Sequence, residues 1–365
     1  MHIQMILPFI DLSTFSSSKE NSLSGILVSL KSVMTKRLRN DVFVGEMSRT
    51  SRDNKPSIRL SRTLDGISVF EQLSSQLKSI PGENLSHSSH SFSVDLDNES
   101  AQDAGGVFRE VLCHAVDDLL NFESNLNIFT PTPNSVEGVG TLQDAVIFNL
   151  NSFNSDHLIT LGKLIGIAIR TANHLSFCLP PFFWKKLVGS SVTLADYSEI
   201  DYYQSFLIDS LSDDKIFTHD QSLTKDNFAD LIDHEFGVKL ASGDFSNLSS
   251  HYNTITYSNK AEYVELAKEV LFAQFDRHIE EIQKGLTGII PLYLLSLLTY
   301  SDIEVMVCGD PVIDIARLKS ITHYGKGGFH PNSPYVLMFW SVLESFSQVQ
   351  RQLFLRFVWG GLNCL

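Results

Sequence analysis

The chain has 365 residues, of which 43% are hydrophobic and 19% charged, a composition typical of a folded globular protein rather than a disordered one. Its formal net charge of −14 argues against a nucleic-acid-binding surface, which requires a concentrated basic face. The four cysteines are widely separated and form no CxxC pair, so neither a zinc site nor a disulfide framework is indicated. We expect no cofactor.

The first 55 residues are rich in serine and in basic side chains, and they predict a lead-in that is partly disordered. Residues 1–10 are apolar but lack the basic segment of a signal peptide, and they are too few to span a membrane. The basic run at residues 36–39 is typical of a solvated face, with a nuclear-import signal as the alternative. We therefore expect a reducing location, cytoplasmic or nuclear, and no membrane.

Beyond the lead-in, the spacing of apolar residues predicts mostly helices. Alternation over residues 92–96 predicts a strand, and Asp103 can cap the helix that follows a turn at residues 103–106. Residues 200–258 are more polar and acidic, which indicates a smaller sub-domain. The expected helices cover residues 64–80, 107–120, 156–175, 182–188 and 263–282. The last is one long amphipathic helix, which Gly285 interrupts.

Several short phrases stand in a fixed order along most of the chain. They are Glu99 with residues 103–110 (DAGGVFRE), residues 162–170 (GKLIGIAIR), residues 184–189 (WKKLVG), Asn259 with residues 262–264 (EYV), Glu304 with residues 307–309 (VCG), residues 318–324 (LKSITHY), Phe339 with Trp340, and residues 354–360 (FLRFVWG). In this order and spacing, from about residue 56 to residue 360, they resemble the HECT-type ubiquitin-protein ligases. The wording is closest to the HERC-type branch of that family.

This resemblance implies an α+β, mostly helical, bilobal fold with a complete N-lobe and an incomplete C-lobe. A glycine suits the hinge between the lobes, since a hinge absorbs large backbone changes over a few residues. The implied parts are a HECT N-lobe at residues 56–307, an E2-binding sub-domain within it at about residues 200–258, a hinge at Cys308, Gly309 and Asp310, and a partial C-lobe at residues 311–365.

The resemblance also implies the chemistry. Ubiquitin passes from an E2 thioester to a cysteine of the ligase and then to a substrate lysine, because a thiolate attacks and leaves readily near neutral pH. The family's cysteine lies in a Thr-Cys phrase preceded by Leu-Pro, and this chain has no such phrase. By the family's spacing, that cysteine is expected beyond Leu365, the last residue of the sequence.

We therefore expect no catalytic residue, and a chain that ends before its nucleophile is expected to be inactive on its own. Cys364 fits a free thiol, whereas Cys113, Cys178 and Cys308 fit structural positions.

The implied partners are an E2 ubiquitin-conjugating enzyme, ubiquitin and a protein substrate. By position, Tyr202 and Tyr263 match residues of the apolar groove that grips an E2 loop, and Phe228 and Leu231 are added from a segment that aligns poorly. Exposed aromatic anchors suit such an interface. The alternative for each of the four is that it packs in the core.

Two other motifs are excluded as sites. Gly162-Lys163 is not a phosphate-binding loop, because His157 stands where the first glycine is needed and Leu164 replaces the serine or threonine. His87 and His90 form too short a motif, in a serine-rich loop, to indicate a metal site.

The predicted function is therefore HECT-type ubiquitin transfer, with E2 docking retained and the nucleophile lost. The alternative is a non-catalytic protein that binds E2 enzymes or sequesters other ligases. The predicted groove supports both equally.

Overall fold

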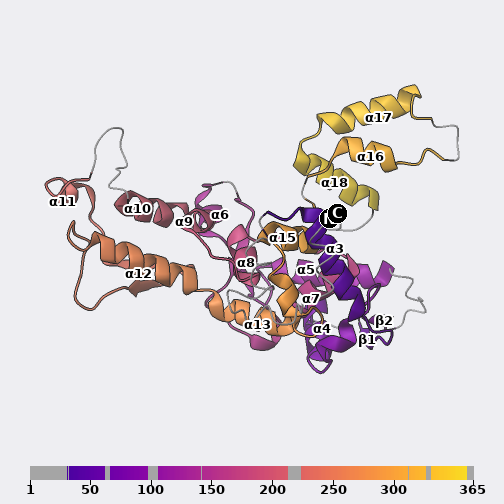
Figure 1. Cartoon of the computed structure of the whole chain (residues 1–365), viewed down its shortest axis with the longest axis horizontal. Coiled ribbons are helices and arrows are strands. Elements are labelled where there is room, and N and C mark those ends of the chain that lie inside the picture. Colours follow the sequence, from indigo (N-terminus) through magenta and orange to yellow (C-terminus); the bar gives the residue numbers. More distant parts are fainter. Residues whose placement is uncertain are drawn as a thin grey trace.

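The structure is a computed structural model of the chain. It describes residues 31, 33–61, 66–97, 106–140, 142–212, 223–310, 312–325 and 330–359. Figure 1 shows three parts, a helical body, an arm that projects from it, and a C-terminal unit. We call the described residues of 201–273 the arm and those of 312–359 the C-terminal unit.

The body consists mainly of helices. In chain order its elements are α3 (Lys36–Arg49), β1 (Ser57–Leu60), α4 (Val69–Leu77), the 3₁₀ helix η3 (Gly82–Leu85), β2 (Ser93–Leu96), α5 (Gly106–Leu120), β3 (Phe129–Pro131), α6 (Pro133–Glu137), β4 (Val146–Phe148), α7 (Ser155–Thr171), α8 (Pro181–Leu187), α9 (Leu194–Tyr197), α13 (Asp276–Leu286), α14 (Leu292–Leu295) and α15 (Tyr300–Cys308). β1 pairs in parallel with β2, in the register Ser57 to Ser93, and β3 pairs antiparallel with β4. The predicted mostly helical α+β class is confirmed.

The arm and the C-terminal unit are smaller. The arm holds α10 (Tyr202–Ser212), α11 (Phe228–Leu231), β5 (Gly237–Lys239), β6 (Phe245–Asn247) and α12 (Lys260–Ala273), and the C-terminal unit holds α16 (Ile315–Ile321), α17 (Pro334–Ser345) and α18 (Gln348–Trp359). β5 and β6 form an antiparallel pair. The predicted turn and cap at Asp103 lie outside the described residues, although the helix after them is present as α5.

The centre of the body is the contact between α7 and α13. Asn154 caps α7 by accepting a hydrogen bond from the His157 backbone N–H, and the helix is buried almost throughout. Where the two helices cross, a Cβ on Gly162 would collide with the carbonyl oxygen of Ile282, and one on Gly285 would collide with that of Ile159. Only two glycines allow the backbones to approach this closely.

Lys163, next to Gly162, has a structural role. Its buried Nζ donates to the carbonyl oxygens of Leu77 at 2.6 Å and Ile80 at 2.9 Å, both at the C-terminal end of α4. The Leu77 carbonyl oxygen also accepts from the Ile80 backbone N–H at 3.1 Å, and a cation near the end of a helix interacts favourably with its carbonyls. Burial lowers the pKa of Lys163. The Gly162-Lys163 pair therefore joins α4, α7 and α13 and binds no phosphate in this arrangement.

Helix α3, which falls within the predicted lead-in of residues 1–55, packs against the body. Its residues Phe43 and Met47 are buried. Arg39 forms a bidentate ion pair with Asp302, with Nε–Oδ2 at 2.6 Å and Nη2–Oδ1 at 3.1 Å, and both side chains are at least 90% buried. Asp302 also belongs to the capping box of α15 with Thr299. These apolar and ionic contacts stabilise α3 on the body.

The long helix expected over residues 263–282 is two helices. α12 ends at Ala273 and α13 begins at Asp276, while Gly285 lies inside α13. At the break, the buried ring of Phe275 packs against Phe182 and Phe148, with centroid distances of 6.2 and 6.4 Å. The spacing of apolar residues cannot show this break, because it runs on from α12, which packs in the arm, to α13, which packs in the body.

The C-terminal unit has a small core of its own. Trp340 lies in it and donates from Nε1 to the hydroxyl of Tyr324 at 2.8 Å. The buried members are Ile313, Ile315, Val336, Trp340, Leu343 and Leu355. The other face of α17 is also apolar but exposed, at Tyr335, Leu337, Met338, Phe339 and Val342.

Replacing Gly162 by alanine is expected to lower the free energy of unfolding by about 1–3 kcal/mol, because the added methyl group must push α7 and α13 apart. Gly45→Ala is the matched control, since Gly45 is exposed on α3 and an added Cβ meets no atom within 4 Å. Alanine should stabilise that site by ~0.5–1 kcal/mol. Urea unfolding measures the free energy of unfolding of both variants. Equal changes in this free energy for Gly162→Ala and Gly45→Ala would contradict the close contact between α7 and α13.

Arg39→Ala is expected to lower the free energy of unfolding by about 3–5 kcal/mol, because it leaves Asp302 buried without its cation. Arg37→Ala is the control. Arg37 pairs with Asp41 at 3.9 Å, but their side chains are 92% and 56% exposed. We expect a change below about 0.5 kcal/mol there.

The effect of Arg39→Ala should depend on pH. Burial alone would raise the pKa of Asp302, but hydrogen bonds from Arg39 and Thr299 outweigh it and lower that pKa from 3.8. A carboxyl with a lowered folded-state pKa stabilises the fold above its unfolded pKa and loses this effect as the pH falls through the folded value. The difference between the wild type and Arg39→Ala should be full at neutral pH and shrink below about pH 4. A difference that stays constant down to pH 2 would contradict this.

Candidate docking surface on the arm

The arm is built on two helices and one short sheet. α12 packs against α10 and β5. Lys260 at the start of α12 donates from Nζ to the carbonyl oxygen of Leu211 at 3.3 Å, near the end of α10. The two helices therefore run in opposite directions, as Figure 1 shows.

Asn134 fixes the root of α10 to the body. Its side chain is buried, its Oδ1 accepts from the Tyr202 backbone N–H at 2.7 Å, and its Nδ2 donates to the Ser198 carbonyl oxygen at 2.8 Å. The Asn134 backbone N–H also donates to the carbonyl oxygen of Ile200 at 3.1 Å. The Asn134 amide thus fixes the backbone at the first turn of α10.

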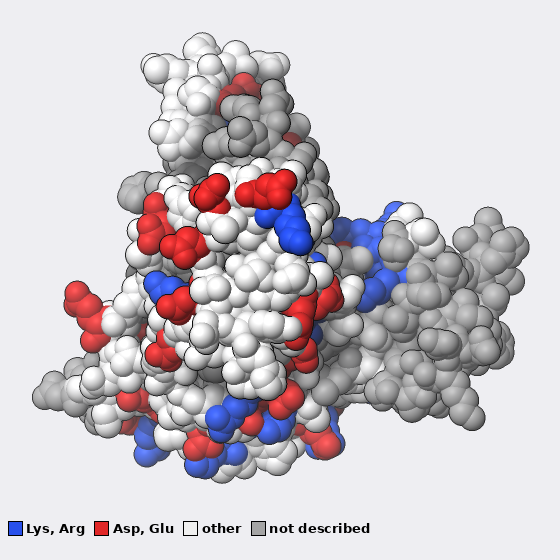
Figure 2. All heavy atoms as spheres, turned by 90° about the vertical axis from the view of Figure 1, so that its left-hand side faces the viewer, with Lys and Arg blue, Asp and Glu red and all other residues white. Residues whose placement is uncertain are grey.

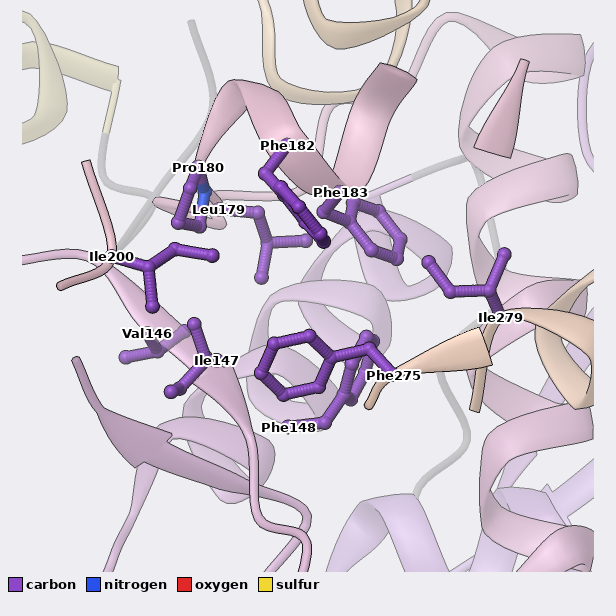
Figure 3. A pocket seen from close by; sticks show the side chains of 10 residues that line it. All are labelled: Val146, Ile147, Phe148, Leu179, Pro180, Phe182, Phe183, Ile200, Phe275 and Ile279. Atoms are coloured by element: carbon purple, nitrogen blue, oxygen red, sulfur yellow. The ribbon is translucent and has the colours of Figure 1, made fainter. Parts of the chain in front are cut away.

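An apolar pocket lies where the arm joins the body. Both chain crossings contribute to it, Ile200 just before α10 and Phe275 just after α12. Figure 3 shows side chains from several elements directed toward this space. They are Val146, Ile147, Phe148, Leu179, Pro180, Phe182, Phe183, Ile200, Phe275 and Ile279. The lining is entirely apolar, so this pocket serves packing and offers no polar group for chemistry.

Tyr263, a predicted groove residue, lies in the core of the arm. It is 1% exposed, its hydroxyl donates to the Gly237 carbonyl oxygen at 3.3 Å, and its ring meets the edge of Phe236 at 5.5 Å. Burial raises the pKa of Tyr263 to about 12. In this structure Tyr263 supports the arm from within and presents no surface to a partner.

The other three predicted groove residues differ in burial. Phe228 is buried against the edge of Tyr257, at a centroid distance of 5.9 Å. Leu231, one turn later on α11, is 38% exposed, and Tyr202 is 44% exposed. The four residues therefore do not form one surface, since two are core and two are exposed.

Phe206 is the residue that the sequence reasoning missed. It stacks on Tyr202, with ring centroids 5.9 Å apart and planes 14° apart, and Tyr203 meets Tyr202 edge-on at 5.8 Å. Tyr203 is 57% exposed. The spacing of Tyr202 and Phe206, four residues apart on one helix, was the available signal. We call Tyr202, Tyr203 and Phe206 the aromatic patch of α10.

The arm is acidic. Residues 201–273 contain thirteen Asp and Glu against five Lys and Arg, a net charge of −8. Figure 2 views the arm end on and shows acidic side chains around a broad uncharged area. This face combines exposed aromatic rings with negative charge, which suits a partner that offers an apolar group beside basic ones.

The predicted hinge residues follow the last turn of α15. Gly309 has φ +85° and ψ 173°, a conformation that favours glycine. Asp310 is exposed and accepts from the Val312 backbone N–H at 3.0 Å. Cys308 is packed against the Phe177 backbone, and burial raises the pKa of its thiol to about 12.

The remaining described thiols, Cys113 and Cys178, are buried and half-buried. Burial raises the pKa of Cys178 to about 11, helped by the charges of Asp144 and Glu304. Cys113 is 6% exposed on α5. A thiol with a raised pKa holds little thiolate at neutral pH.

The last residues of the sequence, Cys364 and Leu365, lie outside the described residues. The structure therefore does not test the assignment of Cys364 as a free thiol. It also does not test the expectation that the catalytic cysteine of the HECT-type ligases falls beyond Leu365. Both stay predictions from the sequence.

Within the described ranges, no cluster of three or more His, Cys, Asp or Glu is placed to hold a metal ion. None of the helices in that same part of the chain is long and apolar enough to cross a membrane.

Comparison with known proteins finds a match over residues 114–361 to the family described as "HECT-domain (ubiquitin-transferase)". The chain is 35% identical to the E3 ubiquitin-protein ligase HERC2 of Mus musculus over 317 residues, which are 84% of the chain and 6% of that protein. It is 29% identical to HUWE1 of Mus musculus over 73% of the chain and 6% of that ligase. It is 26% identical to Nedd-4 of Drosophila melanogaster over 85% of the chain and 29% of that ligase. The chain thus spans a small part of these relatives.

Tyr263→Ala is expected to destabilise the arm by about 3–5 kcal/mol, because it removes a buried ring. Tyr202→Ala should change stability by less than about 0.5 kcal/mol, since it removes an exposed one. Hydrogen exchange of the amides in α10, β5 and α12 measures both. Protection that survives Tyr263→Ala would contradict the core position of Tyr263, and Tyr263→Phe, which loses only the hydroxyl, is the conservative control.

Proposed function

Because the chain belongs to the HECT-domain ubiquitin-transferase family, we propose that its arm docks an E2 ubiquitin-conjugating enzyme through the aromatic patch of α10. The observation that carries this proposal is the stack of the exposed Tyr202 ring on the half-buried Phe206 ring. Large apolar rings held rigid at a surface are typical anchors of protein interfaces. The buried Tyr263 and Phe228 pack inside the arm, and Leu231 is a further exposed apolar residue, on α11.

The rigidity of the patch supports docking over a purely structural role. Asn134 fixes the Tyr202 backbone to the body, so a partner meets a preformed surface and loses little conformational entropy on binding. The patch is also small, which suits a partner that must leave after each transfer.

We propose further that the described thiols do not accept ubiquitin. Transfer to a cysteine requires a thiolate that can reach the E2 thioester. Cys113 is buried, and the pKa values of Cys178 and Cys308 are raised to about 11 and 12. E2 docking is then the activity that residues 31–359 support best.

The second candidate function, a non-catalytic binder that sequesters E2 enzymes or other ligases, uses the same surface. The raised thiol pKa values favour it. A competition assay tests this second function. An excess of this chain should slow ubiquitin transfer by a separate, complete HECT ligase if it sequesters the E2, and should leave the rate unchanged if it does not.

Docking is tested by the affinity for a purified E2. Tyr202→Ala and Phe206→Ala should each weaken binding by about 10- to 30-fold, the usual effect of removing an interface anchor. Phe122→Ala is the matched control, because Phe122 is 46% exposed on the body and Tyr202 is 44% exposed on the arm. Equal affinities for all three variants and the wild type would exclude the patch as the docking surface.

The thiol proposal has its own readout in the same experiment. The chain is mixed with E2 that already carries ubiquitin, and the products are separated on a non-reducing gel. We expect no ubiquitin adduct that reductant removes. Such an adduct would show that one of the four cysteines is a nucleophile, and Cys364→Ser would then identify or exclude the cysteine outside the described residues.

A further inference from the structure

Some charged residues of the described structure pair with each other, and others are exposed and unpaired. In the body, Lys185 pairs with Asp196 at 2.7 Å and Lys186 with Asp276 at 2.6 Å. Asp209, Asp230 and Asp233 on the arm are exposed, and the described residues provide no ion pair for any of them. Their charge is therefore not neutralised within the described structure and acts on an approaching partner.

These three carboxylates stand beside the exposed apolar residues. Asp209 lies on α10 seven residues after Tyr202 and three after Phe206, spacings that place all three side chains on one face of the helix. Asp230 directly precedes Leu231 on α11, and Asp233 follows two residues later. Tyr202 and Leu231, two of the exposed apolar residues of the arm, thus each have an unpaired carboxylate nearby on the same helix or directly after it.

We propose that Asp209, Asp230 and Asp233 make the arm selective for E2 enzymes that carry lysine or arginine beside their apolar docking loop. This inference rests on the proposed E2 docking and names the chemistry of the partner. The aromatic patch supplies the short-range contact, and the carboxylates steer the encounter. Charges at the rim of an interface act mainly on the association rate and on the choice of partner, and salt screens them.

The test measures association and dissociation rates between this chain and a purified E2 that has basic residues beside its loop. The arm variant D209N/D230N/D233N is compared with the body variant D53N/E123Q/E137Q. The three body residues are also exposed, and the change in net charge is the same. We expect the arm variant to associate about tenfold more slowly at an ionic strength of about 0.02 M, with the dissociation rate little changed. At about 0.15 M the difference should shrink to a few-fold.

The partner side gives the reciprocal test. Changing the basic residues of the E2 to glutamate should slow association with the wild-type chain and have little effect on the arm variant. A merely structural role of the three carboxylates would not produce this coupling, because it would alter dissociation and be insensitive to the charge of the E2.

The outcomes separate the two proposals. If the E2 binds and the arm and body variants behave alike at both ionic strengths, the selectivity proposal is wrong and the docking proposal stands. If Tyr202→Ala also leaves binding unchanged, or if the E2 does not bind at low ionic strength, both proposals are wrong. Both proposals are supported if only the arm variant associates more slowly and its association rate depends less on ionic strength than that of the wild type.

Discussion

The contact between α7 and α13 is the constraint on which the rest of the structure depends. Gly162 and Gly285 let the two backbones touch, and a side chain at either position would collide with a carbonyl oxygen of the other helix. α13 directly follows the arm and leads through α14 to α15 and Gly309. The closeness of this one helix pair therefore sets where the arm leaves the body and where the chain passes to the C-terminal unit.

Charged residues in the body hold helix ends rather than perform chemistry. Lys163 occupies the carbonyls at the end of α4, and Arg170 donates to the Met47 carbonyl oxygen at 2.8 Å and to that of Ile289 at 2.9 Å. Arg39 and Asp302 join α3 to α15 over 263 residues of sequence. A buried cation needs several acceptors to offset its desolvation, and helix C-termini provide them.

Much of the helical framework could be predicted from apolar spacing, because that spacing records which face of each helix is buried. α4, α5, α7 and α8 were found close to their predicted ranges. The break at Phe275 could not be predicted, since a ring that enters an apolar pocket leaves the same pattern as one on a helix face. The sequence also could not show the contact between α3 and α15, because Arg39 pairs with Asp302 far along the chain.

The candidate site shows the same limit. Composition identified an acidic sub-domain, and position singled out Tyr202, Phe228, Leu231 and Tyr263. Aromatic residues serve cores and interfaces equally well, so their identity alone could not assign Tyr263 to the core and Tyr202 to the surface. That distinction depends on which face of α10 and α12 meets β5, a tertiary contact without a local sequence signal. Phe206 was accessible in principle, because it lies one turn from Tyr202.

These contacts also decide where motion between a docked partner and the C-terminal unit can arise. The arm is tied to the body by Asn134 and by the apolar lining of the pocket at both of its chain crossings. α15 packs against α7 and α8, and Arg39 holds its first turn. After these elements the chain passes through Gly309, whose φ of +85° is open to glycine and costly for other residues. We infer that a change in distance between the docking surface and the C-terminal unit uses rotation at Gly309, because the base of the arm and α15 are held by packing, a buried amide and a buried ion pair.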